Sequence, residues 1–184
     1  MPQALTLHPG FRCATVQSIQ AAAARPAQGL LMLSYALTGA LHDLWLPPAG
    51  PPARADELWR RTCFEAFIRA GNGDAYLEFN VSPSRQWAAY RFSGYRSGMR
   101  AAGEIAPPAI EARRSHDRFE LDVTLDLTPA PELASAALWR LGLAAVIDGA
   151  NGARSYWALA HPPGAPDFHA ARGFAYDLAM ADPT

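Results

Sequence analysis

Three hydrogen-bonding residues lie in two short segments, at spacings that could place them on one face of a β-sheet. Glu65 belongs to the first segment, and Glu78 and Asn80 belong to the second. Carboxylate and amide groups can hydrogen-bond the hydroxyls of a sugar, while an aromatic ring covers the apolar side of its ring. These residue types favour recognition of a polar small molecule, and the two carboxyls also raise the alternative of glycoside hydrolysis.

The dipeptide Asn72-Gly73 lies between the two segments and favours a two-residue type I′ hairpin turn. Such a turn fixes the register of the flanking strands, because a shift by one residue would move every side chain to the opposite face. One face is then entirely apolar: Phe64 faces Val81, Ala66 faces Phe79, and Ile68 faces Leu77. The other face is polar, with Glu65 opposite Asn80 and Glu78 on the diagonal.

A second tight turn, centred on Ser84-Arg85, would add a third strand to this sheet. In that register Arg91 lies opposite Glu78, and Trp87 joins Tyr76 on the polar face. A three-residue loop would flip the third strand, so the other register stays open. The whole face could also be an ordinary solvated surface that carries one cross-strand salt bridge.

Two further tryptophans, Trp59 and Trp157, are candidate stacking surfaces because polar and basic residues accompany each of them. Trp139 is instead in phase with Leu141 and Leu143, so we expect it in the core.

Haem binding is an alternative, since haem needs axial ligands such as histidine or methionine in an apolar slot. His161 and His169 flank a proline-rich loop and are the candidate histidines. Met32 and Met99 are the possible partners, although Met32 lies in an apolar segment that is typical of a core.

No motif in the sequence predicts a catalytic cycle. The chain has no histidine, cysteine and carboxylate cluster with metal-site spacing, no glycine-rich phosphate loop and no nucleophile elbow. For glycoside hydrolysis, Arg91 opposite Glu78 would keep that carboxylate ionised and unsuited to act as the general acid. We therefore expect no enzyme, no metal ion, and no cofactor other than the haem alternative.

Length and composition predict one globular domain that spans residues 1–184, with half of its residues hydrophobic and 18% charged. The net charge of −1 gives no electrostatic footprint for nucleic acid or for an anionic membrane. The N-terminus lacks the pattern of an export signal, so a cytoplasmic location is expected. Cys13 and Cys63 have no redox-motif spacing and are expected to be reduced.

The elements that must position these residues are β-strands. Sixteen prolines and fourteen glycines divide the chain into short segments, several of which alternate apolar and polar residues. We expect an all-β, antiparallel two-sheet sandwich with about nine strands. The expected strands are 30–37, 63–69, 75–82, 86–92, 110–115, 119–127, 139–148, 155–160 and 174–178. Short helices are expected at 18–24 and 131–137, and the proline-rich run 46–52 is a loop.

Several of these segments resemble the bacterial DOMON-like domains, which are related to the family-nine carbohydrate-binding modules. The matching runs are Arg54–Ile68, Tyr76–Ser84, Gln86–Tyr90 and Ser155–His169, so the resemblance covers nearly the whole chain. It implies a jelly-roll or immunoglobulin-like sandwich with a ligand pocket, whose relatives bind sugars or haem and are generally not catalysts. The positions that match are Glu65, Glu78, Asn80, Trp59, Trp87 and Trp157.

We therefore predict a non-catalytic domain that binds a carbohydrate-like small molecule. The predicted ligand-binding residues are Trp59, Glu65, Glu78, Asn80, Trp87, Arg91, Trp157 and His161. Two alternatives stay open: a haem-binding domain of the DOMON type, and a protein-interaction module that uses an exposed sheet edge or an aromatic patch.

Overall fold

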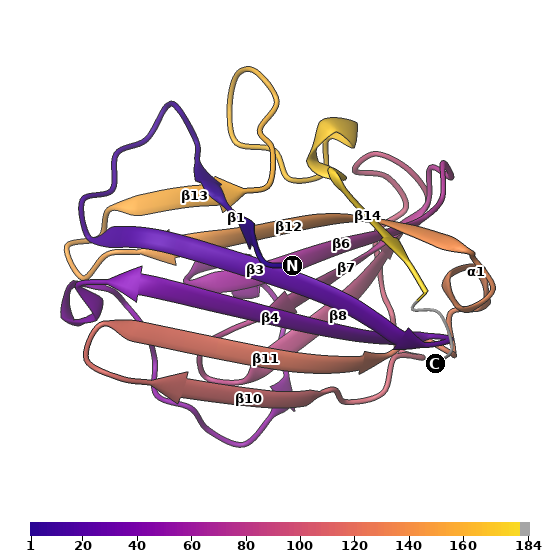
Figure 1. Cartoon of the computed structure of the whole chain (residues 1–184), viewed down its shortest axis with the longest axis horizontal. Helices are drawn as coiled ribbons and strands as arrows, with labels where there is room; N and C mark the ends of the chain where they lie inside the picture. Colours follow the sequence, from indigo (N-terminus) through magenta and orange to yellow (C-terminus); the bar gives the residue numbers. More distant parts are fainter. Residues whose placement is uncertain (181–184) are drawn as a thin grey trace.

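The computed structural model describes residues 1–180 and contains two β-sheets packed face to face (Figure 1). The strand order of the first sheet is β1 (Gln3–Ala4), β3 (Val16–Ala27), β4 (Leu30–Gly39), β11 (Arg118–Asp126) and β10 (Ala109–Arg114). The order of the second is β2 (Thr6–Leu7), β13 (Arg154–Ala158), β12 (Leu138–Asp148), β6 (Cys63–Ala70), β7 (Tyr76–Val81), β8 (Gln86–Phe92) and β5 (Ala53–Arg54). The predicted β-sandwich is confirmed.

Two short strands extend the second sheet: β14 (Tyr176–Ala179) pairs with β12, and β9 (Arg100–Ala101) pairs with β8. Neighbouring strands are antiparallel except for β5, which runs parallel to β8. The helical elements are short: η1 (Leu41–Asp43), η2 (Leu58–Arg60), α1 (Pro131–Ala134) and η3 (Ala171–Gly173). No helix within residues 1–180 has the length and apolar character needed to cross a membrane.

The helix predicted at 18–24 is wrong, because these residues belong to strand β3. Their alanine-rich composition favours a helix, but Ile19 and Ala21 are buried while Gln20, between them, is not. This alternation, together with pairing to β4, shows that tertiary packing overrides the intrinsic helix preference of alanine.

The core lies between the two sheets, as the alternating pattern of 119–127 predicts. Phe119, Leu121, Val123, Leu125 and Leu127 are all buried there, and so is Trp139 on the opposite sheet. The cation of Arg25 lies 4.0 Å from the centroid of the Trp139 ring.

The β6–β7 register is confirmed, but its turn is not the predicted one. Phe64 pairs with Val81, Ala66 with Phe79, and Ile68 with Leu77. A type I′ turn needs positive φ at both Asn72 and Gly73, and the residue with positive φ is instead Gly71, at 51°. The Gly73 amide donates to the Ala70 carbonyl at 3.1 Å, so the chain turns one residue earlier with the same strand pairing.

The predicted β7–β8 register is wrong, because a three-residue loop connects these strands. The Ser82 amide donates to the Gln86 carbonyl at 2.9 Å, and Arg85 adopts a left-handed φ of 69°. This is the three-residue hairpin loop with a left-handed last residue. It sets Tyr90 opposite Glu78, and the side chains of Trp87 and Arg91 move to the other face of the sheet.

Both displaced residues have other partners there. Trp87 is 2% exposed and belongs to the core, where its ring packs against Phe79 and lies 4.1 Å below the guanidinium of Arg54. Arg91 forms ion pairs with Glu104 and Glu132, and not with Glu78. The polar face predicted from the sequence therefore loses its indole and its cation.

We expect Trp87→Ala to lower the free energy of unfolding by about 3 to 5 kcal/mol, because it opens a void in the core. Trp45→Ala is the matched control, since Trp45 is 41% exposed and its loss should cost about 1 kcal/mol or less. Urea denaturation followed by circular dichroism measures both. Equal losses for the two variants would contradict the placement of Trp87.

Candidate functional site

A cavity of about 410 Å³ opens on the face of the second sheet that points away from the core. Glu65 of β6 and Glu78 of β7 lie on its floor, and the apolar neighbours on this face form a second, smaller cluster. The wall includes Trp59 from η2 and the segment between β13 and β14, which contributes Phe168 and His169. In Figure 1 that segment lies at the top of the view, where it extends beyond the sheets.

Glu65 and Glu78 are almost completely buried, with 3% and 4% of each residue exposed. Asn80 lies opposite Glu65 in the ladder and donates from Nδ2 to Glu78 Oε1 at 2.7 Å. Within the described part of the chain, neither Glu65 Oε1 nor Asn80 Oδ1 has a hydrogen-bond partner. The floor of the cavity thus holds two carboxyl groups, one of which has an oxygen without a donor, and a second such oxygen lies beneath it on Asn80.

Burial is the main reason why both glutamates have raised pKa values. It raises the pKa of Glu65 well above its ordinary value, and the charge of Glu78 raises it further. Burial also raises the pKa of Glu78 to about 7, although the hydrogen bond from Asn80 and the charge of Arg96 act in the opposite direction. Near neutral pH, therefore, losing both protons from the pair is unfavourable.

His169 does not compensate this charge. Its Nε2 lies 3.8 Å from Glu78 Oε2, and its Nδ1 is hydrogen-bonded to the Tyr76 hydroxyl at 2.8 Å. Burial, reinforced by the charge of Arg96, lowers the pKa of His169 to about 4 despite the opposing effect of Asp167. The imidazole is consequently neutral at physiological pH and gives the glutamates no cationic partner.

Three arginines also line the cavity, and each is bound to an acid that does not line it. The side chain of Arg96 donates to Asp167 Oδ1 at 2.8 Å from Nη2, and Arg60 donates to Glu57 Oε1 at 2.8 Å. Arg154 donates to both oxygens of Asp148, at 2.7 and 3.1 Å. Each guanidinium group that lines the cavity is therefore already paired with an acid outside it.

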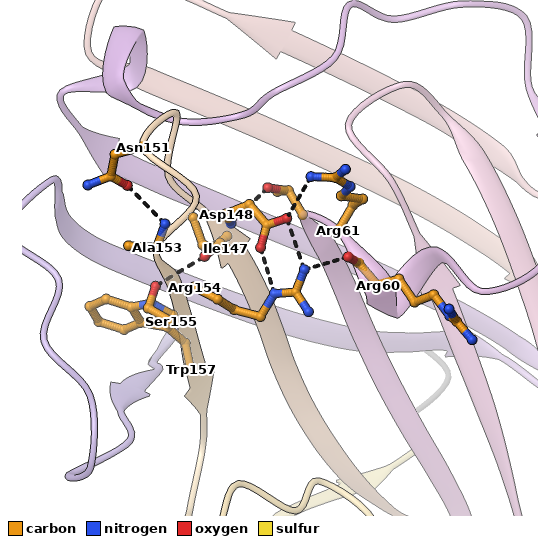
Figure 2. A network of polar contacts seen from close by, with 10 residues as sticks. Arg60, Arg61, Ile147, Asp148, Asn151, Ala153, Arg154, Ser155 and Trp157 are labelled. Carbon is orange, nitrogen blue, oxygen red and sulfur yellow. Dashed lines mark hydrogen bonds and ion pairs between the residues drawn. The ribbon is translucent and has the colours of Figure 1, made fainter.

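Figure 2 shows the Arg154 network from close by. Asp148 is 4% exposed and also has Arg61 at 3.7 Å. Arg154 reaches further to the carbonyl oxygen of Arg60, so the network ties strands β12 and β13 to the short helix η2. We infer that this tie holds Trp59, the middle residue of η2, at the edge of the cavity.

Aromatic rings form much of the remaining wall. Phe92, Tyr156 and Phe168 line the cavity together with Trp59. The ring of Trp59 meets Tyr90 edge to face with centroids 5.6 Å apart. The Tyr90 hydroxyl in turn donates to Asp56 Oδ1 at 2.8 Å.

Half of the residues predicted from the sequence come together at this site. Trp59, Glu65 and Glu78 line the cavity, and Asn80 is bonded to Glu78 beneath it. The other four, Trp87, Arg91, Trp157 and His161, do not line it.

Trp87 and Arg91 point to the opposite face because of the register shift described above. Trp157 is 7% exposed within the core and donates from Nε1 to Ser155 Oγ at 3.0 Å. The Nε2 atom of His161 is hydrogen-bonded to the Thr6 carbonyl at 2.8 Å, and its ring packs against His8.

Sequence reasoning missed most of the wall. Phe92 reaches the cavity because β8 is shifted from its predicted register. The left-handed conformation of Arg85, which causes this shift, is not evident from the sequence. Phe168 and His169 lie in a loop whose path no periodicity predicts, although the resemblance drew attention to that segment.

The residues of the cavity do not fit haem. Met99 and His169 both line it, but the two nitrogens of His169 face Tyr76 and Glu78. An apolar macrocycle would also have to cover two buried carboxyl groups, which is unfavourable. Among residues 1–180, no three histidine, cysteine, aspartate or glutamate side chains are grouped so that they could hold a metal ion.

We expect Glu78→Gln to become more stable relative to the wild type as the pH rises from about 4.5 to about 7. The reason is that the folded protein holds the Glu78 proton up to a pKa of about 7, whereas the unfolded chain releases it near 4.5. Stability of the wild type is therefore lost across this window, and the glutamine variant does not suffer that loss.

The difference should reach about 3 kcal/mol, which is the free energy of a shift of this size. Measuring the difference between the two proteins cancels the contribution of His169, which titrates over an overlapping range with the opposite sign. Urea denaturation at a series of pH values gives the result. A difference that does not vary with pH would show that Glu78 titrates normally.

The fold is similar to that of a candidate carbohydrate-binding protein from Bacteroides uniformis, known from a crystal structure. The TM-score is 0.68 and the sequence identity is 12%, over 98% of this chain and 86% of that chain. At this identity the likeness shows a shared fold. No protein-family model matches the chain, and no curated protein matches its sequence.

Proposed function

We propose that this protein is a non-catalytic domain that binds a carbohydrate-like small molecule in the cavity above β6 and β7. The observation that carries the proposal is a buried, unpartnered oxygen, Glu65 Oε1, of a residue on the floor of an aromatic-walled cavity, with a second one, Asn80 Oδ1, beneath it. Buried acceptors without donors are unfavourable, and a ligand that supplies hydroxyl or amine hydrogens would satisfy them.

The size and lining of the cavity suit such a ligand. A volume of about 410 Å³ falls within the range of small-molecule sites. A protonated carboxyl can donate a hydrogen bond and an ionised one can accept it, so a pair that shares protons can match hydroxyls of either orientation. The ring of Trp59 at the edge offers the flat surface against which the C–H side of a sugar can stack.

Two further observations support the proposal. The central strands and the late loop resemble the DOMON-like domains and their relatives among the carbohydrate-binding modules. The similar solved structure is that of a candidate carbohydrate-binding protein, and its fold extends over nearly all of this chain. A single domain over residues 1–184 and a cytoplasmic location both stay predictions from the sequence.

The state of the carboxyl pair favours binding over hydrolysis. Arg91 does not keep Glu78 ionised, as the sequence had suggested, because Arg91 lies on the other face of the sheet. The structure supplies a different reason. A glycosidase nucleophile or base must be fully ionised at its working pH, whereas burial leaves Glu78, with a pKa of about 7, only partly ionised near neutral pH, and Glu65 Oε1 receives no supporting hydrogen bond from residues 1–180.

We expect Trp59→Ala to weaken saccharide binding by about 1 to 3 kcal/mol while the protein stays folded. A thermal-shift screen with mono- and oligosaccharides finds a ligand first, because binding to the folded state raises the unfolding midpoint. Titration calorimetry with that saccharide then compares the variants.

The matched control is Trp45→Ala, which removes an exposed indole that does not line the cavity and should leave the affinity unchanged. If no saccharide in the screen shifts the midpoint, or if Trp59→Ala binds like the wild type, the proposed site is wrong.

A further inference from the structure

The carboxyl pair on the cavity floor has no cation of its own. The arginines that line the cavity are bonded to Glu57, Asp148 and Asp167, none of which lines it. Asp148 even has a second cationic neighbour in Arg61. Among the described residues, no arginine forms an ion pair with Glu65 or Glu78.

The other titratable groups around the pair, on its own strands and on neighbouring elements, supply no unpaired cation. They are Cys63 on β6, Tyr35 on β4, Tyr76 on β7, Tyr90 on β8, Arg96 after β8, and Asp167 and His169 in the late loop. Arg96 is the one cation among them, and Asp167 holds it. The rest are neutral or acidic near neutral pH.

The two glutamates are buried, unlike ordinary acidic residues at a protein surface. Glu65 is 3% exposed, and its Oε1 has no hydrogen-bond partner among the described residues although the side chain lines the cavity. A ligand with a hydrogen-bond donor could supply the partner that this oxygen lacks. Above it stand the rings of Trp59, Phe92, Tyr156 and Phe168, whose faces attract cations.

We propose that the ligand is a saccharide with a protonated amine, and that its ammonium group binds at Glu65 and Glu78 beneath the aromatic wall. This inference rests on the proposed function and narrows it from carbohydrates to amino sugars. An ammonium has three donor hydrogens and one positive charge, which together match the unpartnered Glu65 Oε1 and two carboxyls that have no cationic partner.

Binding of an ammonium should be linked to protons. The ammonium favours the ionised carboxylates, so for an amine that stays protonated the affinity should rise as the pH increases through the pKa of Glu78, which is about 7. Binding near that pH should also release a proton. Calorimetry detects the release as an enthalpy that depends on the ionisation heat of the buffer.

Two matched pairs of probes test the inference by titration calorimetry on the full chain. The first pair is the β-1,4-linked disaccharide of glucosamine against cellobiose, which carries a hydroxyl in place of each amine. The second pair is cyclohexylamine against cyclohexanol, which tests the cation without a sugar. We expect the amine of each pair to bind about 10- to 100-fold more tightly at about pH 7, where the sugar amines still carry protons. Cyclohexylamine keeps its charge above that pH, so for the second pair the preference should grow at about pH 8 and shrink at about pH 6.

The double variant Glu65→Gln, Glu78→Gln keeps the shape of the floor and removes its charge, so it should abolish the preference for the amines. Glu111→Gln removes an equally negative but exposed side chain on the other sheet and should keep the preference. Circular dichroism checks that each variant is folded.

The outcomes separate the two proposals. If the disaccharides bind equally well, the saccharide function stands and the ammonium site is wrong. If cyclohexylamine alone binds, the ammonium site stands and the saccharide function is wrong. If no probe binds, or if the preference survives in the double variant, the inference is overturned.

Discussion

The burial of two carboxyl groups without a cation is the constraint on which the rest of this structure depends. Glu65 and Glu78 lie on adjacent strands with less than a twentieth of each residue exposed. Placing ionised carboxylates there is costly, and the protein supplies one donor, Asn80, to one of the two. Natural proteins keep such arrangements mainly where they serve a function. The unfavourable floor is therefore the strongest sign of a ligand site in the described part of the chain.

The surrounding elements maintain this condition. The hairpin of β6 and β7 fixes the two glutamates, because the other face of the same strands forms the core between the sheets. Two of the cations around the cavity are paired with acids from neighbouring elements: Asp167 of the late loop binds Arg96, and Asp148 at the end of β12 binds Arg154. The neutral His169 completes the enclosure. These contacts leave the two carboxyls of the floor without a cationic partner in the protein.

The sequence predicts the parts of the site that rest on regular pairing. The apolar pairs from Phe64 with Val81 to Ile68 with Leu77 are enough to place Glu65, Glu78 and Asn80 on one face, even though the turn between the strands differs. The third strand is mispredicted because Arg85 adopts a left-handed conformation, which is not expected for an arginine. The late loop is unpredictable for another reason, since its path depends on contacts such as that of Tyr95 with Asp167, which are distant in sequence.

The most direct test of this account is to measure the pKa values of the buried pair. A ¹³C NMR titration of the glutamate side-chain carboxyls, assigned with Glu65→Gln and Glu78→Gln, reports the protonation of each group. The account predicts one titration near pH 7 for Glu78 and a value for Glu65 well above its ordinary range. If both carboxyls titrate near 4.5, they are solvated or paired with a cation, and the proposed ligand site loses its physical basis.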